Sequence, residues 1–434
     1  MVPNVATEED VGLPIWEERL IAALIFSATI FGLLPSGFRW TDFDNNSSYV
    51  AGSIGFQLQW GSVFVVSTLI VARHRALSLS NLLAANPFIL VMLIYCAAST
   101  IWSPAPIITI KKAIQFAGLI LFGLAIQTNR RHWTHSIHVI LMALTTIEFL
   151  SAIVAIVNPS FGIDAEFGYA WRGIVPHKNS LGWIGAVAML LWVALGEVGT
   201  VRRSVFWFGF GLSLLCVVMS KSSTGMTIAA VGLFSYWLLR KQHITSPLWL
   251  LRLTVTAAMT LILLGHLFFI FEGRLPEQSE LVTPVASLFG KNADLTGRVD
   301  IWEPLGLEIK KHWVLGIGNG AFWLGPGSAS QGVLDSLSWV PFQGHNGYLD
   351  VLNELGLTGM LLFLGLLVFH FHHLTQLNRF DKRAAALFAS ILIIILFSNL
   401  TESSLFRGVD FPFMLMILSC VSVTSTLSQR VLAH

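Results

Sequence analysis

The chain has 434 residues, of which 54% are hydrophobic and 12% charged, and its formal net charge is +2. An average soluble domain has roughly 25% charged residues, so this composition excludes a soluble globular protein, a disordered chain and a collagen-like chain. The mean hydropathy of +0.71 and the long apolar runs instead predict a polytopic helical membrane protein, because the strands of a membrane β-barrel are only weakly apolar.

Apolar runs of the length of a membrane span recur along the whole chain. A helix needs about 20 apolar residues to cross the ~30 Å hydrocarbon core of a bilayer. We therefore predict an all-α polytopic integral membrane protein with about 12 transmembrane helices, and expect the first to be retained, because an acidic segment rather than a basic one precedes it. The twelve runs are 17–35, 50–72, 87–103, 111–127, 136–157, 180–199, 204–220, 224–240, 247–271, 353–373, 384–400 and 411–428.

The basic residues of the short loops predict the orientation, since such residues gather on the cytoplasmic side. With both termini inside, each inner loop between helices carries at least two of them. These loops contain Arg73/Arg75, Arg130/Arg131, Arg202/Arg203, Arg240/Lys241 and Arg379/Lys382/Arg383.

One hydrophilic segment is much longer than the other connections, and it divides the chain. We expect residues 1–271 to form transmembrane helices 1–9, residues 272–345 to form a large folded periplasmic loop or cap, and residues 346–434 to form helices 10–12. Uninterrupted loops of this length are usually functional or disordered.

Polar motifs precede the helices that would run from outside to inside. The positive end of the helix dipole and the free N–H groups of these N-termini suit an anion. The residues that we expect to bind a diphosphate or another part of a polyanionic headgroup are Lys111, Lys112, Arg172, Lys178, Asn179, Lys221, Arg298, Asn346 and Arg407.

Simpler roles account for some of these residues. Asn179, like the neighbouring serines and threonines, is a good helix cap whatever the function, and Lys111, Lys112 and Arg407 could reach lipid headgroups. Arg172, Lys178 and Arg298 favour a functional role more strongly, because basic residues on the outer side oppose the usual topology bias. We expect no dedicated metal site, since His345 points away from the face that Asp350 and Glu354 would share on a helix.

Five stretches, in order, resemble motifs of one family. Gly344-His345-Asn346-Gly347 through Glu354-Leu-Gly356 and Gly359 resembles the HNxxLxxxxExGxxG signature of the O-antigen ligase and Wzy-type polymerase superfamily. The other four are Trp171-Arg172-Gly173 with His177-Lys178-Asn179-Ser180-Leu181-Gly182, Ser220-x-Ser222-x-Thr224, Thr296-Gly297-Arg298 with Trp302, and Leu315-Gly316-Ile317-Gly318-Asn319-Gly320. The RGxxxHKNxLG form of the first of these four, and the order of the TGR…W and LGxGxG stretches, are most similar to exopolysaccharide polymerases of the succinoglycan type.

The resemblance implies a metal-independent glycosyltransferase with a GT-C-like fold and no cofactor. Its implied donor is an undecaprenyl-diphosphate-linked oligosaccharide at the periplasmic face of a bacterial inner membrane. Arginine and lysine would stabilise the departing diphosphate. His345 is the first candidate for the base that activates the acceptor hydroxyl, and Glu354 is the second candidate or an orienting partner. A one-step displacement would invert the anomeric centre.

The function that we predict from these motifs is polymerisation of repeat units into exopolysaccharide or O-antigen. The alternative is ligation of the glycan to lipid A core. Polymerases and ligases share the donor chemistry, and the sequence does not show which acceptor is used. A lipid-linked sugar flippase or transporter fits less well, since transporters place ionisable residues near the membrane midplane. The expected partners are the lipid-linked donor, a glycan acceptor, the bilayer and other polysaccharide export or assembly proteins, and no nucleic acid.

Overall fold

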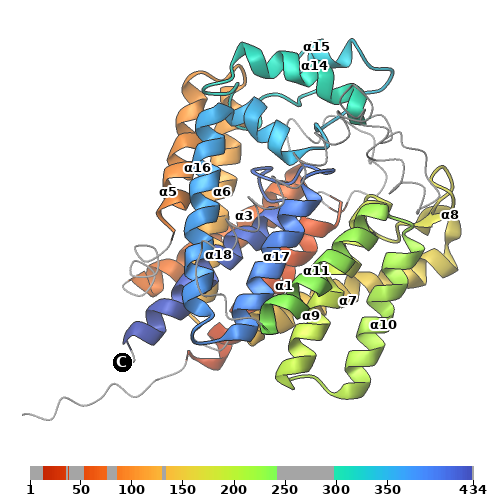
Figure 1. The fold of residues 1–434 in the computed structure, drawn as a ribbon, viewed down its shortest axis with the longest axis vertical. Coiled ribbons are helices and arrows are strands. Elements are labelled where there is room, and N and C mark those ends of the chain that lie inside the picture. Colours follow the sequence, from red (N-terminus) through yellow and green to blue (C-terminus); the bar gives the residue numbers. More distant parts are fainter. Residues whose placement is uncertain are drawn as a thin grey trace, which may run out of the picture.

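The computed structural model describes residues 13–35, 38, 53–75, 86–129, 133–241 and 298–432, and this part of the chain is mostly helical (Figure 1). The long helices are α1 (Ile15–Leu33), α3 (Ile54–Arg73), α5 (Pro87–Ala98), α6 (Pro106–Gln127), α7 (Thr134–Val157), α9 (Lys178–Val198), α10 (Arg203–Met219), α11 (Ser223–Lys241), α14 (Arg298–Lys311), α16 (Gly347–Leu377), α17 (Lys382–Ser398) and α18 (Phe411–Leu432). The short elements are η2 (Ser99–Ile101), α8 (Pro159–Gly162), α15 (Gln331–Leu334) and an antiparallel pair of strands, β1 (Ile163–Asp164) and β2 (Ala170–Trp171).

Capping residues in the sequence account for several helix ends. Asn86 accepts the Phe88 N–H at the start of α5, where Pro87 occupies the first turn, and Asp381 accepts two N–H groups at the start of α17. Asn346 accepts the N–H groups of Tyr348 and Leu349 at the start of α16. Each of these side chains satisfies donors that a helix leaves unpaired.

The described helices agree with the apolar runs of the sequence. Eleven of the twelve expected runs coincide with helices, and the run 247–271 lies outside the described residues. Within the described part, five helices (α3, α6, α7, α9 and α16) are long and apolar enough to cross a membrane, and three shorter stretches are apolar: Pro87–Ile101, Arg203–Met219 and Phe411–Thr424. The count of twelve spans and the GT-C-like arrangement stay predictions.

Helix α9 lies in the middle of the packing, against α7, α10, α11 and α17. Close approach to α11 depends on two glycines: a Cβ atom on Gly182 would lie 3.3 Å from Gly225 Cα, and one on Gly225 would lie 2.8 Å from Gly182 Cα. The small residues let the two helix N-termini meet, as small residues do where membrane helices pack closely.

The described part of the long hydrophilic segment, residues 298–345, has a small hydrophobic core of its own. Ile301, Leu305, Phe322, Trp323 and Val333 form this core, and all are buried. Figure 1 shows α14 and α15 together at one end of the helical bundle. We call residues 298–345 the cap and this end of the bundle the cap end.

Helix α16 is interrupted at Gly356, whose backbone (φ 66°, ψ −170°) is not helical. Residues 313–318 of the cap supply the missing hydrogen bonds: the carbonyls of Asn353 and Glu354 accept the N–H groups of Ile317 and Gly318. The N–H groups of Leu357 and Thr358 donate to the carbonyls of Trp313 and Val314. The break therefore leaves these four backbone groups paired, as buried backbone requires.

Two glycines make this contact possible. A Cβ atom on Gly356 would lie 2.4 Å from Val314 O, and one on Gly316 (φ 72°) would lie 2.4 Å from the backbone carbonyl carbon of Glu354. The two glycine-containing motifs, 315–320 and 354–359, are thus two halves of one packed unit.

We expect Gly356→Ala to lower the thermal unfolding midpoint of the detergent-solubilised protein. Its φ and ψ lie in a region that is essentially limited to glycine, where strain costs of order 1–3 kcal/mol, and the added methyl group would collide with Val314. Gly211→Ala in α10 is the matched control, because nothing lies within 4 Å of its Cβ position. Equal midpoints for Gly356→Ala and the control would contradict this account of the interrupted helix.

Candidate active site at the cap end

The N-termini of five helices lie at the cap end. Those of α9 and α11 meet through the hydrogen bond from Ser222 Oγ to Asn179 Oδ1 (3.0 Å). The N-terminus of α16 is attached to the α17–α18 connection by the Gly347 N–H. The side chains of Lys112 and Gln115, from α6, reach Gly408, two residues before the Asp410 that precedes α18. These are the helices that carry the polar motifs of the sequence.

His345 lies two residues before α16, next to the N-cap residue Asn346, in a backbone conformation that is uncommon for a residue other than glycine (φ 48°). The preceding residue is held on two sides: the Gly344 N–H donates to both carboxylate oxygens of Asp350 (3.1 Å each), and its carbonyl accepts from Trp302 Nε1 (2.8 Å). The His345 ring lies 6.3 Å from the ring of Trp339, centroid to centroid. Hydrogen bonds on both sides of Gly344 thus fix the loop that carries the His345 imidazole.

The carboxylate of Glu402, in the connection between α17 and α18, faces three side chains from two distant segments, the start of α9 and the end of the cap. Its Oε1 accepts from Asn179 Nδ2 (3.0 Å), and its Oε2 faces Gln343 Nε2 and His345 Nδ1, both at 3.4 Å. We call Ser222, Asn179, Glu402, Gln343 and His345 the Glu402 network. Both His345 and Glu402 keep about a quarter of their side-chain surface exposed, at 22% and 25%, so a ligand can reach them.

Arg407 orients the amide of Gln343. Its Nη1 donates to Gln343 Oε1 (3.3 Å) and to Asp350 Oδ2 (3.4 Å), and its Nη2 donates to the Phe342 carbonyl (2.7 Å). The amide oxygen therefore faces Arg407, and the amide nitrogen faces Glu402 and His345. Asp350 also accepts from Trp323 Nε1 (2.8 Å), so this carboxylate is occupied by donors from the cap and from Arg407.

Glu354 lies in a different environment from His345. Its Oε2 accepts the Gly320 N–H (2.7 Å), which attaches the cap loop to α16. The charges of Arg407, Lys112 and Asp350 act on it. Lys112 passes close to Gly320 and Gly408, since a Cβ atom on either would lie within 3.3 Å of its side chain.

A second group of cations lies around the β1–β2 hairpin. Arg172 Nε donates to the Phe161 carbonyl (3.0 Å) and its guanidinium lies over the Phe161 ring, while Lys178 Nζ lies over the Phe167 ring (5.1 Å). Lys221, also at positive φ (47°), donates to the Gly168 carbonyl (2.8 Å). Lys111 is exposed on α6, and α14 begins at Arg298, whose side chain lies outside the described part.

The structure therefore joins some expected residues and separates others. Asn179 and His345 belong to one network, Asn346 caps α16 beside it, and Arg407 is linked to it through Gln343. Glu354 contacts the cap instead. Sequence reasoning left four participants out of the expected site: His177, Gln343, Glu402 and Asp410. Glu402 had a signal, since it stands five residues before Arg407 in a polar connection, whereas nothing in its spacing pairs it with His345.

Asp410, next to α18, completes the charged groups of this end. Burial raises its pKa to about 6, against the opposing effects of Arg407, the Phe411 N–H and Lys112. Among the described residues, no group of three or more histidine, cysteine, aspartate or glutamate side chains is arranged to hold a metal ion.

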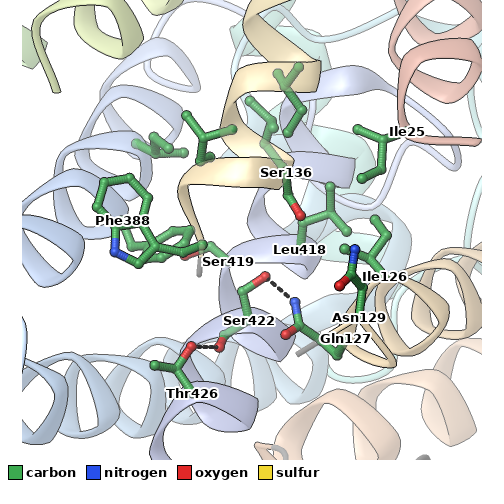
Figure 2. A pocket seen from close by; sticks show the side chains of 15 residues that line it. Ile25, Ile126, Gln127, Asn129, Ser136, Phe388, Leu418, Ser419, Ser422 and Thr426 are labelled. Carbon is green, nitrogen blue, oxygen red and sulfur yellow. Dashed lines mark hydrogen bonds between the residues drawn. The ribbon is translucent and has the colours of Figure 1, made fainter. Parts of the chain in front are cut away.

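A cavity of about 40 Å³ lies at the other end of the bundle. Figure 2 shows Gln127 and Ser422 at its wall, joined by a hydrogen bond of 2.7 Å between Gln127 Nε2 and Ser422 Oγ. Gln127 ends α6, the helix whose other end carries Lys112, so this cavity is remote from the polar motifs.

Comparison with known proteins shows what the chain is similar to. Residues 208–364, which include His345 and Glu354, match the family model described as O-antigen ligase. The resemblance to the O-antigen ligase and Wzy-type polymerase superfamily is confirmed. The chain is also 24% identical over 288 residues to the exopolysaccharide production protein ExoQ of Rhizobium meliloti (strain 1021), across 63% of this chain. It spans 62% of the length of that relative, somewhat less than two thirds.

Proposed function

We propose that the protein is a membrane glycosyltransferase that polymerises undecaprenyl-diphosphate-linked repeat units at the periplasmic face of a bacterial inner membrane. The observation that supports this most is the Glu402 network, which assembles a histidine, a carboxylate and two amides where helix N-termini converge. The similarity to an exopolysaccharide production protein favours a polymerase. The proposal includes twelve GT-C-like spans, both termini in the cytoplasm, and assembly with export proteins.

The diphosphate is the group that most needs stabilisation, because it leaves with a negative charge. Preorganised cations and N–H donors lower the energy of such a transition state without a metal ion. Arg172, Lys178, Lys221 and Arg298, with Lys111 and Lys112, are the cations that we propose for this role. Arg407 contributes charge but is tied to Phe342, Gln343 and Asp350, which supports a role in positioning the His345 loop.

His345 is the base that we propose. The acceptor hydroxyl oxygen attacks the anomeric carbon of the donor sugar and gives its proton to His345. The bond from that carbon to the diphosphate oxygen breaks with its electron pair, so the anomeric centre inverts. For this step the neutral ring carries its proton on Nδ1 and donates it to Glu402 Oε2, to which Gln343 Nε2 also donates, so Nε2 keeps the free lone pair that accepts the acceptor's proton. Glu402, rather than Glu354, then orients the ring and stabilises the imidazolium.

Ligation is the second candidate. It is supported by the match of residues 208–364 to the family model described as O-antigen ligase. A ligase would use the same donor and the same base, and would differ in requiring a lipid A core acceptor. Product analysis therefore separates the two functions.

Purified protein incubated with one lipid-linked repeat unit is expected to give a ladder of products on a gel. The ladder should persist in EDTA, because cationic side chains and helix N-termini serve the diphosphate. A product that forms only after lipid A core is added would replace the polymerase by the ligase. Activity that EDTA abolishes and Mg²⁺ restores would contradict metal independence.

Replacing His345 tests its role as base. We expect His345→Ala, His345→Gln and His345→Asn to lower turnover by about 10²–10⁴-fold, the usual contribution of general acid–base catalysis, while donor binding stays largely intact. Asparagine is informative because it tolerates positive φ well but has no titratable nitrogen. His312→Gln, in the cap, is the control, since His312 bonds Asn353 outside the network (3.1 Å). A His345→Asn enzyme at near wild-type turnover would remove His345 from the chemistry.

Cysteine labelling tests the orientation. Ser338 in the cap and Ser204 in the first turn of α10 are exposed, whereas the native Cys96, Cys216 and Cys420 are buried at 0% exposure. In intact spheroplasts, an impermeant maleimide is expected to label Ser338→Cys at once and Ser204→Cys only after lysis. The opposite order would place the cap, and the proposed site, in the cytoplasm.

A further inference from the structure

His177, which the proposed mechanism does not use, has one ring nitrogen committed to the protein. It is the N-cap residue of α9, and its Nδ1 accepts the backbone N–H of Asn179 (3.2 Å). A ring nitrogen that accepts a hydrogen bond carries no proton, so the neutral ring holds its proton on Nε2. A charged imidazolium would instead direct an N–H group at the Asn179 N–H.

The surroundings of His177 also favour the uncharged ring. Burial lowers its pKa; Glu402 and Asp164 oppose this, and Lys178 and His345 add to it. Among the described residues, these four are the charged and titratable groups that act on it, and they come from the α17–α18 connection, the hairpin, α9 and the cap. The positive end of the α9 dipole acts in the same direction as Lys178.

Aromatic contacts hold the ring in place. The edge of the Phe167 ring meets it at 5.3 Å between centroids and an interplanar angle of 75°, and the same Phe167 ring carries the Lys178 ammonium group at 5.1 Å. His177 Nε2 has no hydrogen-bond partner within the part of the chain that the structure describes. His177 is partly exposed, so its Nε2–H is free to donate to a ligand, and a neutral imidazole N–H pairs with an acceptor atom.

We propose that His177 is a substrate-binding residue that stays uncharged and donates its Nε2–H to a phosphate oxygen of the lipid diphosphate. The proposal rests on the proposed function for the identity of the ligand. A phosphate oxygen suits the place, because Lys178 and the α9 N-terminus favour an anion there. No proton is transferred, so His177 binds and orients the donor, while His345 carries out the proton transfer.

The first test measures the protonation state without activity. Protein labelled with ¹⁵N-histidine in nanodiscs is studied by solid-state NMR, and the His177 signal is assigned by its disappearance in His177→Gln. We expect the neutral ring with its proton on Nε2 at pH 7. An imidazolium signal, or a proton on Nδ1, would overturn the inference even if the enzyme transfers glycan.

The second test measures binding of undecaprenyl diphosphate in nanodiscs. His177→Ala is expected to weaken binding by about 10- to 100-fold, the range for a hydrogen bond to a charged group. His177→Gln should recover part of the loss, because its amide nitrogen can still donate. His138→Ala, a change to a histidine near the opposite end whose Nδ1 contacts the Thr134 carbonyl (2.7 Å), is the control.

The outcomes of the binding test separate the inference from the proposed function. Binding by His177→Ala equal to that of the wild type overturns the inference, whether or not product forms. Weakened binding with recovery in His177→Gln supports it, even if the transfer reaction of the proposed function is absent. Loss in His177→Gln equal to that in His177→Ala would also overturn it, because a donor at this position would then not matter.

Discussion

Two chain segments that are distant in the sequence, the start of α9 and the end of the cap, meet at the carboxylate of Glu402. Asn179 at the start of α9, Gln343 in the cap and His345 before α16 all direct a nitrogen at its two oxygens. The Glu402 backbone carbonyl also accepts the Gly347 N–H (3.1 Å). Polar groups that are withdrawn from water need partners, and this residue supplies them for several elements at once. The relative positions of α9, α16 and the cap therefore depend on it.

In the interrupted helix α16, backbone groups of the cap supply the partners that the buried polar groups need. Irregular backbone at membrane depth is tolerated where it is buried in protein, and the cap loop provides that cover by pairing with the chain on both sides of Gly356. Glu354 adds a side-chain bond to the same loop. The signature from His345 to Gly359 thus combines a residue of the proposed site with residues that join the cap to the bundle.

Most helices were predictable from the sequence, because an apolar run of the length of a membrane span forms a helix regardless of which elements pack against it. The sequence also predicted that Asn179, His345 and Arg407 would stand before helices at one end. It did not predict the partner of His345, because Glu354 is close to it in sequence while Glu402 reaches it only through the fold. Helical spacing across 345–356 carried no sign of the positive φ at His345 or of the break at Gly356. Backbone conformations of this kind depend on tertiary contacts with the cap, which local patterns do not contain.

The location of the donor diphosphate is the central claim, and a structure with an unreactive lipid-linked donor tests it directly. Cryo-electron microscopy of the protein bound to an undecaprenyl-diphosphate-linked sugar with a non-hydrolysable glycosyl bond would locate the two phosphorus atoms. Our account predicts density for the diphosphate at the cap end, beside the α9 N-terminus, with the sugar next to His345. Density for the diphosphate in the cavity beside Gln127 and Ser422, at the opposite end, would contradict it.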